Sequence, residues 1–227
     1  MSEKSVKLIE NFVSWQGEGP DAGQSMIILR FKTCNRNCSW CDTRVKMRIS
    51  AEAEHKLDDI QNTIIETRSG LLITGGEPTA DRHFKECLDL INELDYPIAN
   101  VESNGYNLFK LIELSDSIKP VYFIYSPKIF SEKDLVEAED LTAELLRHFS
   151  NDVFIKVVYE ERNEVIEYLD WLSSRIGDRV DKFDKVWLMP EGTNRSDLIR
   201  NSSMVFDACE KYRFNFSSRD HIIFGFV

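Results

Sequence analysis

Three cysteines lie close together in the stretch Cys34-Asn35-Arg36-Asn37-Cys38-Ser39-Trp40-Cys41. Their spacing is C-x3-C-x2-C, and they directly follow the apolar run 26–31, which is typical of a buried strand. Thiolates are soft ligands that suit iron, and a complete iron–sulfur set uses four of them. Three thiolates leave one iron with an open position, where a small molecule can bind. The spacing therefore predicts a cluster that takes part in chemistry and does more than carry electrons.

The remaining two cysteines do not supply an evident fourth ligand. Cys87 and Cys209 lie in stretches of helical apolar periodicity, where free cysteine usually belongs to the core. A zinc site normally needs four protein ligands. An odd set of five cysteines without a signal peptide argues against disulfides. Zinc and plain thiols stay as the alternatives to a cluster.

Six apolar runs alternate with helical patterns, and these elements must position the cysteines. Strands that alternate with helices are parallel and are joined by right-handed crossovers. The order predicts one α/β domain over residues 1–227, built as a partial, open (β/α)6 barrel of the TIM type. The predicted strands are 26–32, 71–74, 98–102, 121–125, 153–159 and 185–189.

The segments between these strands predict helices, together with a strand over 6–13 before the first of them. Residues 45–55 show no clear period and predict a connection, and Gly70 is expected to end the helix before it. The apolar end 222–227 predicts a terminus that is tied down, because a frayed tail would be polar. The predicted helices are 56–68, 84–94, 108–114, 140–149, 165–176 and 197–212.

Charge and hydropathy exclude several classes of function. The net charge of −11 and the lack of any basic block make a nucleic-acid backbone a poor direct partner. The N-terminus lacks the apolar core of a signal peptide, and no apolar run approaches the ~18 residues of a membrane helix. We therefore expect a cytoplasmic protein, in a compartment where thiols stay reduced.

Glycine and polar motifs stand at the ends of the predicted strands. Ligands bind at the C-terminal ends of strands in α/β folds, so this placement favours a binding site. In the loop 14–20, a tryptophan and a glutamine among glycines can stack on a flat heterocycle, although an ordinary hairpin connection is an equal alternative. Gly75 and Gly76 allow a ligand to approach the backbone closely, with a strand-to-helix turn as the alternative.

The cysteine loop resembles that of the radical S-adenosylmethionine superfamily, and the motifs around it resemble, in order, those of the 7-carboxy-7-deazaguanine synthase family. The pair Ser103-Asn104 departs mildly from the expected Thr-Ser or Thr-Asn, and serine keeps the hydroxyl. The matching motifs are Trp15-Gln16-Gly17-Glu18-Gly19, Arg30, Cys41-Asp42-Thr43, Gly75-Gly76-Glu77-Pro78, Glu102-Ser103-Asn104-Gly105 and Ser126-Pro127-Lys128.

The resemblance implies a [4Fe–4S] cluster on Cys34, Cys38 and Cys41, with S-adenosylmethionine on its fourth iron. Lys128 on its own would be read as a solvated surface charge. The residues implied in cofactor binding are Trp40, Cys41, Asp42, Gly75, Gly76, Glu77, Gly105, Ser126, Pro127, Lys128, Met189, Pro190, Glu191 and Gly192.

The resemblance also implies a pterin substrate and a magnesium ion. Arg30 would bind the substrate carboxylate, a role that suits its planar fork, although a surface arginine at a strand edge is the alternative. Thr43 would ligate Mg²⁺, although a helix N-cap is the commoner use of threonine. The residues implied in substrate binding are Trp15, Gln16, Gly17, Glu18, Arg30, Ser103 and the terminal carboxylate of Val227.

The reaction implied is conversion of 6-carboxy-5,6,7,8-tetrahydropterin to 7-carboxy-7-deazaguanine with loss of ammonia, a step toward queuosine-type nucleosides. Reductive cleavage of the cofactor would supply the radical, and no protein side chain would carry it. A flavodoxin-type electron donor and a homodimer are the family expectations. The rival interpretations are a small glycyl-radical-enzyme activase and an iron–sulfur or zinc binding module without turnover.

Overall fold

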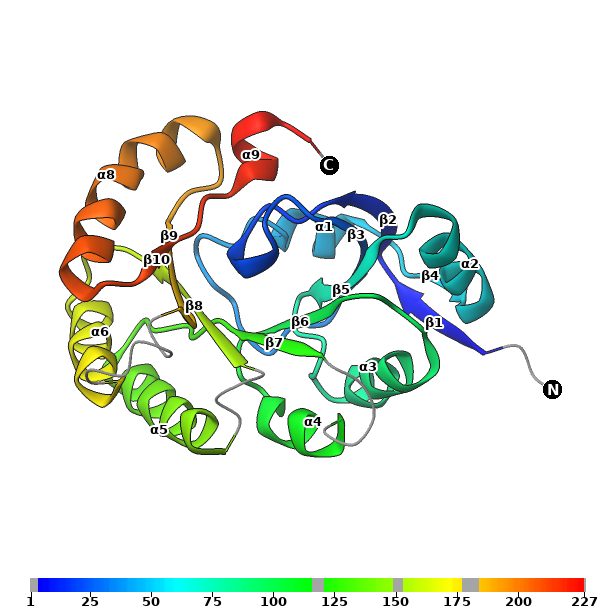
Figure 1. Ribbon diagram of the computed structural model, residues 1–227, viewed down its shortest axis with the longest axis horizontal. Coiled ribbons are helices and arrows are strands. Elements are labelled where there is room, and N and C mark those ends of the chain that lie inside the picture. Colours follow the sequence, from blue (N-terminus) through cyan, green and yellow to red (C-terminus); the bar gives the residue numbers. More distant parts are fainter. Residues whose placement is uncertain (1–3, 116–120, 149–152, 177–183, 227) are drawn as a thin grey trace. The chain divides into compact units, whose positions relative to one another are not determined.

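The predicted alternation of strands and helices is present in the computed structural model of the chain (Figure 1). The structure describes residues 4–115, 121–148, 153–176 and 184–226. Their contacts divide into two compact units, one of residues 1–16 and 23–123 and one of residues 17–22 and 124–226. Each unit is described by itself, and the single domain expected over residues 1–227 stays a prediction.

The first unit is built on a run of four strands in the order β2-β3-β5-β6, and a separate antiparallel pair joins β1 to β4. Strand β3 is antiparallel to β2 and parallel to β5, and β5 is parallel to β6. Its elements are β1 (Ser5–Leu8), β2 (Glu10–Trp15), β3 (Ser25–Phe31), α1 (Arg44–Ile49), β4 (Ala53–Lys56), α2 (Leu57–Thr67), β5 (Gly70–Gly75), α3 (Arg82–Glu93), β6 (Ala99–Ser103) and α4 (Leu108–Ser115).

The core of the first unit follows from the alternation of side chains along β3. Met26 and Ile28 pack with Leu72 on one face of the sheet, while Ile27 and Leu29 are fully buried on the other. The register of β3 and β5 sets Arg30 opposite Thr74 and Phe31 opposite Gly75. The cysteine loop and the glycine pair therefore begin at the same end of adjacent parallel strands.

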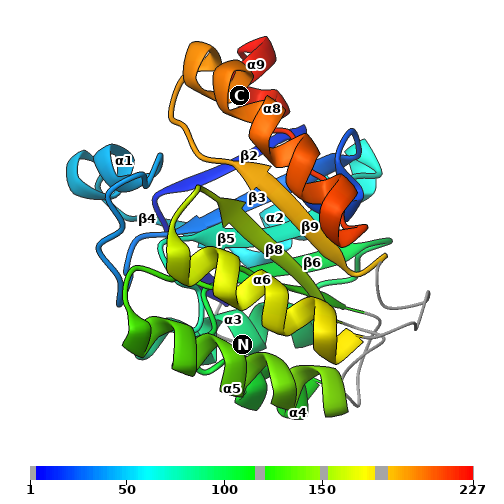
Figure 2. The ribbon, with the colours of Figure 1, turned by 90° about the vertical axis from the view of Figure 1, so that its left-hand side faces the viewer.

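The second unit has three consecutive parallel strands, β8, β9 and β10, and β7 (Tyr122–Tyr125) lies at the boundary of the units. Figure 2 shows helices α5 and α6 side by side, and α8 packs on β9. Its elements are a 3-10 turn (Gly19–Asp21), α5 (Glu132–His148), β8 (Val153–Tyr159), α6 (Asn163–Ile176), β9 (Val186–Pro190), α8 (Arg195–Tyr212), β10 (Asn215–Phe216) and α9 (Asp220–Phe224).

All six predicted strands are confirmed, as β3 and β5 to β9, but the N-terminal strand is divided. A bend at Ile9 separates β1 from β2, and the two strands have different partners. The predicted connection over 45–55 was wrong, because it contains α1 and β4. No residue of α1 is buried, so this short helix leaves no apolar period in the sequence.

Two helix boundaries differ from expectation, and the apolar chain end is in part exposed. Helix α2 ends at Thr67, and its C-cap residue Arg68 has the left-handed φ of 54°, while Gly70 begins β5. Helix α5 begins at Glu132, earlier than predicted, behind a polar cap in which the amide of Asp134 donates to Ser131 Oγ at 3.3 Å. Phe224 in the apolar end is 72% exposed, so this end does not enter the core.

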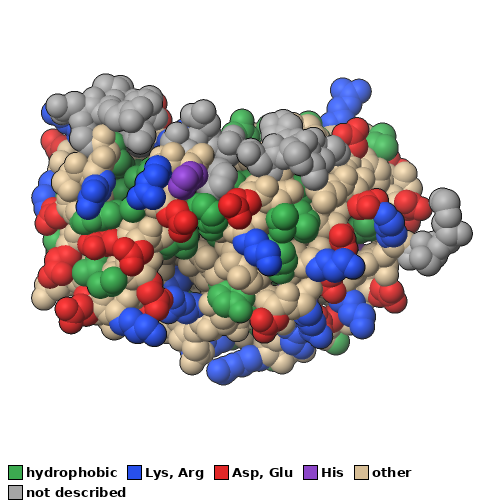
Figure 3. All heavy atoms as spheres, turned by 90° about the horizontal axis from the view of Figure 1, so that it is seen from below, with side chains coloured by type: hydrophobic (Ala, Val, Ile, Leu, Met, Phe, Trp, Pro, Cys, Tyr) green, Lys and Arg blue, Asp and Glu red, His purple; other side chains and the backbone are tan. Residues whose placement is uncertain are grey.

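The surface agrees with the interpretation drawn from composition. On the face shown in Figure 3, acidic and basic side chains are interspersed, and hydrophobic side chains lie between them. None of the helices in the described part of the chain is both long and apolar enough to cross a membrane.

Candidate functional site

The three cysteines of the predicted cluster lie on one loop between β3 and α1. Cys34, Cys38 and Cys41 are not in disulfides, and neither are Cys87 and Cys209. Cys38 is buried, and the other two loop thiols are half-buried. The loop closes on itself, because the Cys41 amide donates to Cys38 O at 3.4 Å and Arg44 donates to the same carbonyl at 2.5 Å.

The donors around this loop fit an iron–sulfur cluster. The amide of Arg36 donates to Cys34 Sγ at 3.4 Å, and N–H groups directed at sulfur are one of the ways in which proteins tune such clusters. The residues of the loop thus provide three soft ligands and at least one donor to the charge that they would carry. This arrangement is consistent with the predicted cluster, whose bound geometry stays a prediction.

Of the two remaining cysteines, Cys87 is a core residue and Cys209 is half-buried. Cys87 in α3 is fully buried, and burial raises the pKa of its thiol above the ordinary range. Burial also raises the pKa of Cys209 in α8, to about 11. A thiol that resists ionisation is a poor metal ligand, so the chemistry of these two agrees with the role in packing assigned to them.

The glycine pair after β5 is packed directly against the start of the cysteine loop. Gly75 has a φ of 133°, and the Gly76 amide donates to Phe31 O at 3.0 Å. A Cβ on Gly76 would overlap Thr33 O and would lie 2.9 Å from Cys34 Cβ. Glycine is therefore required here by close approach of two backbones, and the exposed edge of the pair is free of side chains.

Glu77 is fully buried, and its carboxylate accepts hydrogen bonds from two directions. Oε1 accepts from the amide and hydroxyl of Thr79, at 3.0 and 2.6 Å, and from Ser103 Oγ at 2.9 Å. Oε2 accepts from the amide of Asn104 at 2.6 Å. Burial raises the pKa of Glu77 although these donors oppose the shift. The side chain expected to contact the cofactor thus joins the end of β5 to the end of β6.

Thr33, directly before Cys34, is held from two sides. Its carbonyl accepts from the Glu77 amide at 2.7 Å, and its Oγ1 lies 2.9 Å from Nε2 of the buried His83. Nδ1 of His83 is 3.0 Å from Glu86 Oε2, and Arg82 Nε donates to Nε2 at 3.4 Å. These partners assign Nε2 as an acceptor, so the Thr33 hydroxyl donates to it. Sequence reasoning missed His83, because it lies within a helical apolar pattern and belongs to none of the motifs.

Arg30, at the end of β3, forms an ion pair within the sheet. Its Nε donates to Glu10 Oε2 at 2.6 Å, and Lys46 Nζ donates to Glu10 Oε1 at 2.8 Å. Burial raises the pKa of Glu10, but the two cations outweigh it and hold the pKa below its usual range. Two cations share one carboxylate, so this corner of the first unit keeps a positive charge that an anionic ligand can meet.

Trp15 and Gln16 end β2 and differ in exposure. Trp15 is 55% exposed, whereas Gln16 is buried. The Gln16 amide donates to Gln24 O at 2.8 Å, and the Gly23 amide donates to Gln16 O at the same distance. The exposed indole of Trp15 is available for stacking, and its contact with a substrate stays a prediction.

Thr43 occupies the N-cap position of α1, but its side chain makes no capping hydrogen bond. Its Oγ1 lies 3.3 Å from Cys41 Sγ. The commoner use of threonine is therefore not the one seen, and the hydroxyl is directed at the cysteine loop that also carries Trp40 and Asp42.

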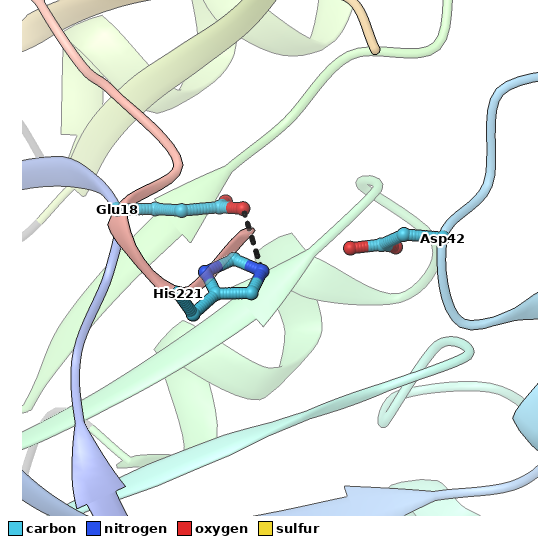
Figure 4. Close-up of side chains that lie close together, drawn as sticks. All are labelled: Glu18, Asp42 and His221. Atoms are coloured by element: carbon cyan, nitrogen blue, oxygen red, sulfur yellow. Dashed lines mark ion pairs between the residues drawn. The ribbon is translucent and has the colours of Figure 1, made fainter. Parts of the chain in front are cut away.

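In the second unit, Glu18 is the centre of a buried cluster of charges. Lys156 Nζ donates to Glu18 Oε2 at 2.5 Å, and Arg219 Nε donates to Oε1 at 2.9 Å. Figure 4 shows the ring of His221 beside the same carboxylate, with Nε2 4.0 Å from Oε1. Burial alone would raise the pKa of Glu18, but Lys156, Arg219 and His221 outweigh it and hold the pKa well below its ordinary value.

The C-terminal segment supports the glycine loop that carries Glu18. The Asp220 amide donates to Gly17 O at 3.0 Å, and the Gly19 amide donates to Ser217 Oγ at 2.8 Å. A Cβ on Gly17 would lie 2.5 Å from His221 Nδ1. Sequence reasoning missed Lys156, Arg219 and His221. A lysine within the otherwise apolar strand 153–159 was the one available signal.

The remaining predicted cofactor residues of the second unit lie at the ends of β7 and β9. Lys128 Nζ donates to Ser126 Oγ at 2.7 Å, across Pro127. Met189 and Pro190 are the last residues of β9, and the next two residues, Glu191 and Gly192, are both held by hydrogen bonds to their carbonyls. Arg219 donates to Gly192 O at 2.6 Å, and Asn201 Nδ2 donates to Glu191 O at 2.8 Å.

Within each unit, the structure thus brings the predicted residues to strand ends. In the first unit, Asn104 Nδ2 also points at the cysteine loop, 2.8 Å from Asn35 Oδ1, while Gly105 donates from its amide to Ser103 Oγ at 3.0 Å. Val227 lies outside the described residues. The roles assigned to the individual side chains remain predictions.

Comparison with known proteins adds a family to this geometry. Residues 28–169, more than half of the chain, match the model described as the Radical SAM superfamily. The chain is 26% identical over 223 residues to the 7-carboxy-7-deazaguanine synthase of Hyperthermus butylicus, covering 96% of this chain and 92% of that one. It is 28% identical over 187 residues to the synthase of the same name from Thermoplasma acidophilum, covering 79% and 82%.

Solved structures show the fold. The crystal structure of QueE from Escherichia coli matches with a TM-score of 0.59 at 20% identity, covering 94% of this chain and 93% of that one. SuiB of Streptococcus suis, bound to the precursor peptide SuiA, matches with a TM-score of 0.56 at 17% identity, covering 85% of this chain and 48% of that one. The predicted α/β fold with a mostly parallel sheet, of the partial TIM-barrel type, is confirmed.

Proposed function

The chain belongs to the radical S-adenosylmethionine superfamily, and on that premise we propose that it is a 7-carboxy-7-deazaguanine synthase. It would convert 6-carboxy-5,6,7,8-tetrahydropterin to 7-carboxy-7-deazaguanine with loss of ammonia. The observation that carries the proposal is the loop of three free thiols at the end of β3, packed on the glycine pair after β5. Relatives with the synthase name align with nearly the whole chain, which supports the choice within the superfamily.

The superfamily implies a [4Fe–4S] cluster and S-adenosylmethionine, and Cys34, Cys38 and Cys41 would hold the cluster. When bound, the cluster supplies the electron that cleaves the cofactor and releases an adenosyl radical. Gly75 and Gly76 present bare backbone to the amino end of the cofactor. Glu77 acts through the main chain that its carboxylate holds in place, because the donors of Thr79, Ser103 and Asn104 already occupy that carboxylate.

For the substrate, Arg30 binds the carboxylate through its terminal nitrogens, since Glu10 holds its Nε. Trp15 offers an exposed ring to the pterin, and Gln16 with Gly17 borders it. Thr43 provides a hydroxyl to Mg²⁺, which favours oxygen ligands and keeps several waters. The ion would orient the substrate carboxylate and stabilise charge as the ring contracts.

The proposal extends to the setting of the reaction. A flavodoxin-type protein donates the electron, the enzyme works as a homodimer, and it works in the cytoplasm, where an oxygen-sensitive cluster survives. The product enters the synthesis of queuosine-type or other 7-deazapurine nucleosides. These points follow from the family resemblance.

An anaerobic assay tests the proposal directly. Purified protein is reconstituted with iron and sulfide and is given reductant, S-adenosylmethionine, Mg²⁺ and the carboxytetrahydropterin, and the products are read by mass spectrometry. We expect 7-carboxy-7-deazaguanine, with about four iron and four sulfide per chain. Cys34→Ser should lose the product, whereas the matched control Cys209→Ser, outside the loop, should retain it.

Other outcomes assign the protein elsewhere. Cleavage of the cofactor without deazaguanine would reject this substrate and favour an activase that acts on a protein. Zinc without sulfide would reject the radical chemistry altogether.

Omission of Mg²⁺ should slow the wild type more than Thr43→Val, because the variant has already lost the proposed ligand.

A further inference from the structure

The side chain of Asn104 is directed at the first cysteine of the loop. Asn104 follows β6, and its Nδ2 donates to Asn35 Oδ1 at 2.8 Å and lies 3.9 Å from Cys34 Sγ, within the longer range of a hydrogen bond to sulfur. The Tyr106 amide donates to Oδ1 at 3.2 Å. Because Oδ1 accepts from a backbone amide, the atom that faces the cysteine loop is the nitrogen Nδ2, which is a donor.

The position of Asn104 is set by the buried carboxylate of Glu77. The Asn104 amide donates to Glu77 Oε2 at 2.6 Å, and the preceding Ser103 donates from its hydroxyl to Oε1 at 2.9 Å. The backbone at residue 104 is therefore bonded to the segment that follows β5. In that segment Gly76 lies so near the cysteine loop that a Cβ added to it would be 2.9 Å from Cys34 Cβ. Asn104 and Cys34 approach one another on a framework that is hydrogen-bonded on both sides.

Cys34 accepts a second N–H from within the loop. The Arg36 amide lies 3.4 Å from Cys34 Sγ, so an amide of the backbone and an amide of a side chain converge on one sulfur. Each such donor stabilises negative charge on the sulfur, and a cluster carries more of that charge when it is reduced. The side-chain donor is the one that mutation can remove without altering the backbone.

We propose that Asn104 donates a hydrogen bond to the Cys34 sulfur and thereby raises the reduction potential of the cluster held by the three loop cysteines, with Glu77 as the positioning residue. The inference rests on the cluster that the superfamily implies, and it does not depend on which substrate the enzyme uses. It gives a function to a residue that the sequence motif contained but that the cofactor and substrate assignments left unused.

The test is an anaerobic redox titration of the reconstituted cluster, carried out without cofactor or substrate. Electron paramagnetic resonance measures the reduced cluster at each potential. Asn104→Leu removes the donor at similar volume, and Asn104→Asp removes it while adding a negative charge. We expect both variants to have lower potentials than the wild type, with Asn104→Asp the lower. Asn35→Ala is the matched control, because it removes the other acceptor of Asn104 and leaves Cys34 in place, so its potential should equal that of the wild type.

Several results would overturn the proposal. An Asn104→Leu cluster with wild-type iron content and wild-type potential rejects the hydrogen bond, and an equal shift in Asn35→Ala makes loop packing the cause. Loss of iron from both Asn104 variants, with apoprotein that melts as the wild type does, would make Asn104 a residue of cluster assembly and not of tuning. If Asn104→Leu does not fold, Asn104→Ser, which keeps an oxygen for the Tyr106 amide, is titrated in its place and is judged by the same criterion.

The titration is independent of the substrate assignment. If the wild-type protein bound no iron or sulfide after reconstitution, the cluster itself would be refuted. Wild-type protein with a cluster but no deazaguanine would refute the proposed function, while the shift in Asn104→Leu would still be measured.

Discussion

Among the described residues, each of the two units buries one glutamate, and the two carboxylates have opposite surroundings. In the first unit, Glu77 is surrounded by neutral donors from Thr79, Ser103 and Asn104, and burial raises its pKa. In the second, Glu18 is held by the cations of Lys156 and Arg219, which lower its pKa in spite of burial. Neutral donors fix the position of a carboxylate without fixing its charge, whereas cations fix both.

Each of the two glutamates joins neighbouring segments of its own unit through hydrogen bonds. Glu77 joins the ends of β5 and β6 beside the cysteine loop, and Glu18 joins the glycine loop to β8 and to the C-terminal segment. Their difference predicts that removal of charge has unequal consequences. Loss of the Glu18 charge leaves buried cations, while loss of the Glu77 charge leaves only neutral donors.

The largest effect is expected for Glu18→Gln. The change leaves Lys156 and Arg219 buried without a counter-charge, and breaking a buried ion pair in this way costs about 3–5 kcal/mol. Urea unfolding at neutral pH measures it. As a control, the double variant Glu18→Gln with Lys156→Met should be more stable than the single variant, because one uncompensated cation is gone. A loss below about 1 kcal/mol would show that the cluster is hydrated and not buried.

Glu77→Gln should cost less, about 1–3 kcal/mol, because the amide cannot accept from all the donors that face it but no charge is stranded. The same urea measurement applies. Ser103→Ala removes one donor only and should cost less again. If Glu77→Gln proved as costly as Glu18→Gln, the contrast between neutral and cationic surroundings would be wrong.

The dependence on pH should have opposite sign for the two sites. The folded-state pKa of Glu18 is lowered, so its stabilisation is present above the ordinary carboxyl pKa of 4.5 and is lost as the pH falls below it. The folded-state pKa of Glu77 is raised, so its ionisation reduces stability as the pH rises from 4.5 through the higher folded value. Unfolding free energies of the wild type and both glutamine variants across this range measure the difference.

As the pH rises from 4.5, the difference in unfolding free energy between the wild type and Glu77→Gln should therefore shrink, while the difference between the wild type and Glu18→Gln should stay constant. Below pH 4.5 the difference between the wild type and Glu18→Gln should decline. Parallel curves for the two variants would contradict the assignment of opposite shifts.

The smallest effect is expected at an exposed pair, which sharpens the comparison. Arg82 donates to both oxygens of Glu52 at 3.0 Å, but its side chain is 62% exposed. Glu52→Gln should change the unfolding free energy by at most ~0.5 kcal/mol, because exposed pairs are hydrated and screened. High salt should remove even this change, and a loss above ~1 kcal/mol would mean that ion-pair geometry, and not burial, governs stability here.

Local pattern was sufficient for most of the fold and for the cysteine loop. Strands such as 153–159 and helices such as 165–176 have clear periods, and the thiols are neighbours in sequence. Helix α1 was missed because none of its residues is buried, and a pattern that buries nothing has no period to detect. Its position directly after the cysteine loop depends on contacts such as Lys46 with Glu10, 36 residues apart.

The chemistry of the buried charges was predictable only in part. Glu77 was assigned to the cofactor through the family resemblance of the motif Gly75-Gly76-Glu77-Pro78. Its hydrogen-bond partners Ser103 and Asn104 lie on and directly after the next strand, which the motif does not reveal. Lys156 and Arg219 are 138 and 201 residues from Glu18. Pairings over such distances are decided by the tertiary fold, and no local motif encodes them.

The bond between Glu18 and Arg219 has a consequence for synthesis on the ribosome. Arg219 is synthesised 201 residues after Glu18, which at ~5–20 residues per second is a wait of roughly 10–40 seconds. During that interval the nascent chain holds an acidic group that its own later residues have yet to neutralise. The buried ion pairs of the glycine loop are therefore complete only after Arg219 has been synthesised, and the second unit cannot finish its assembly before then.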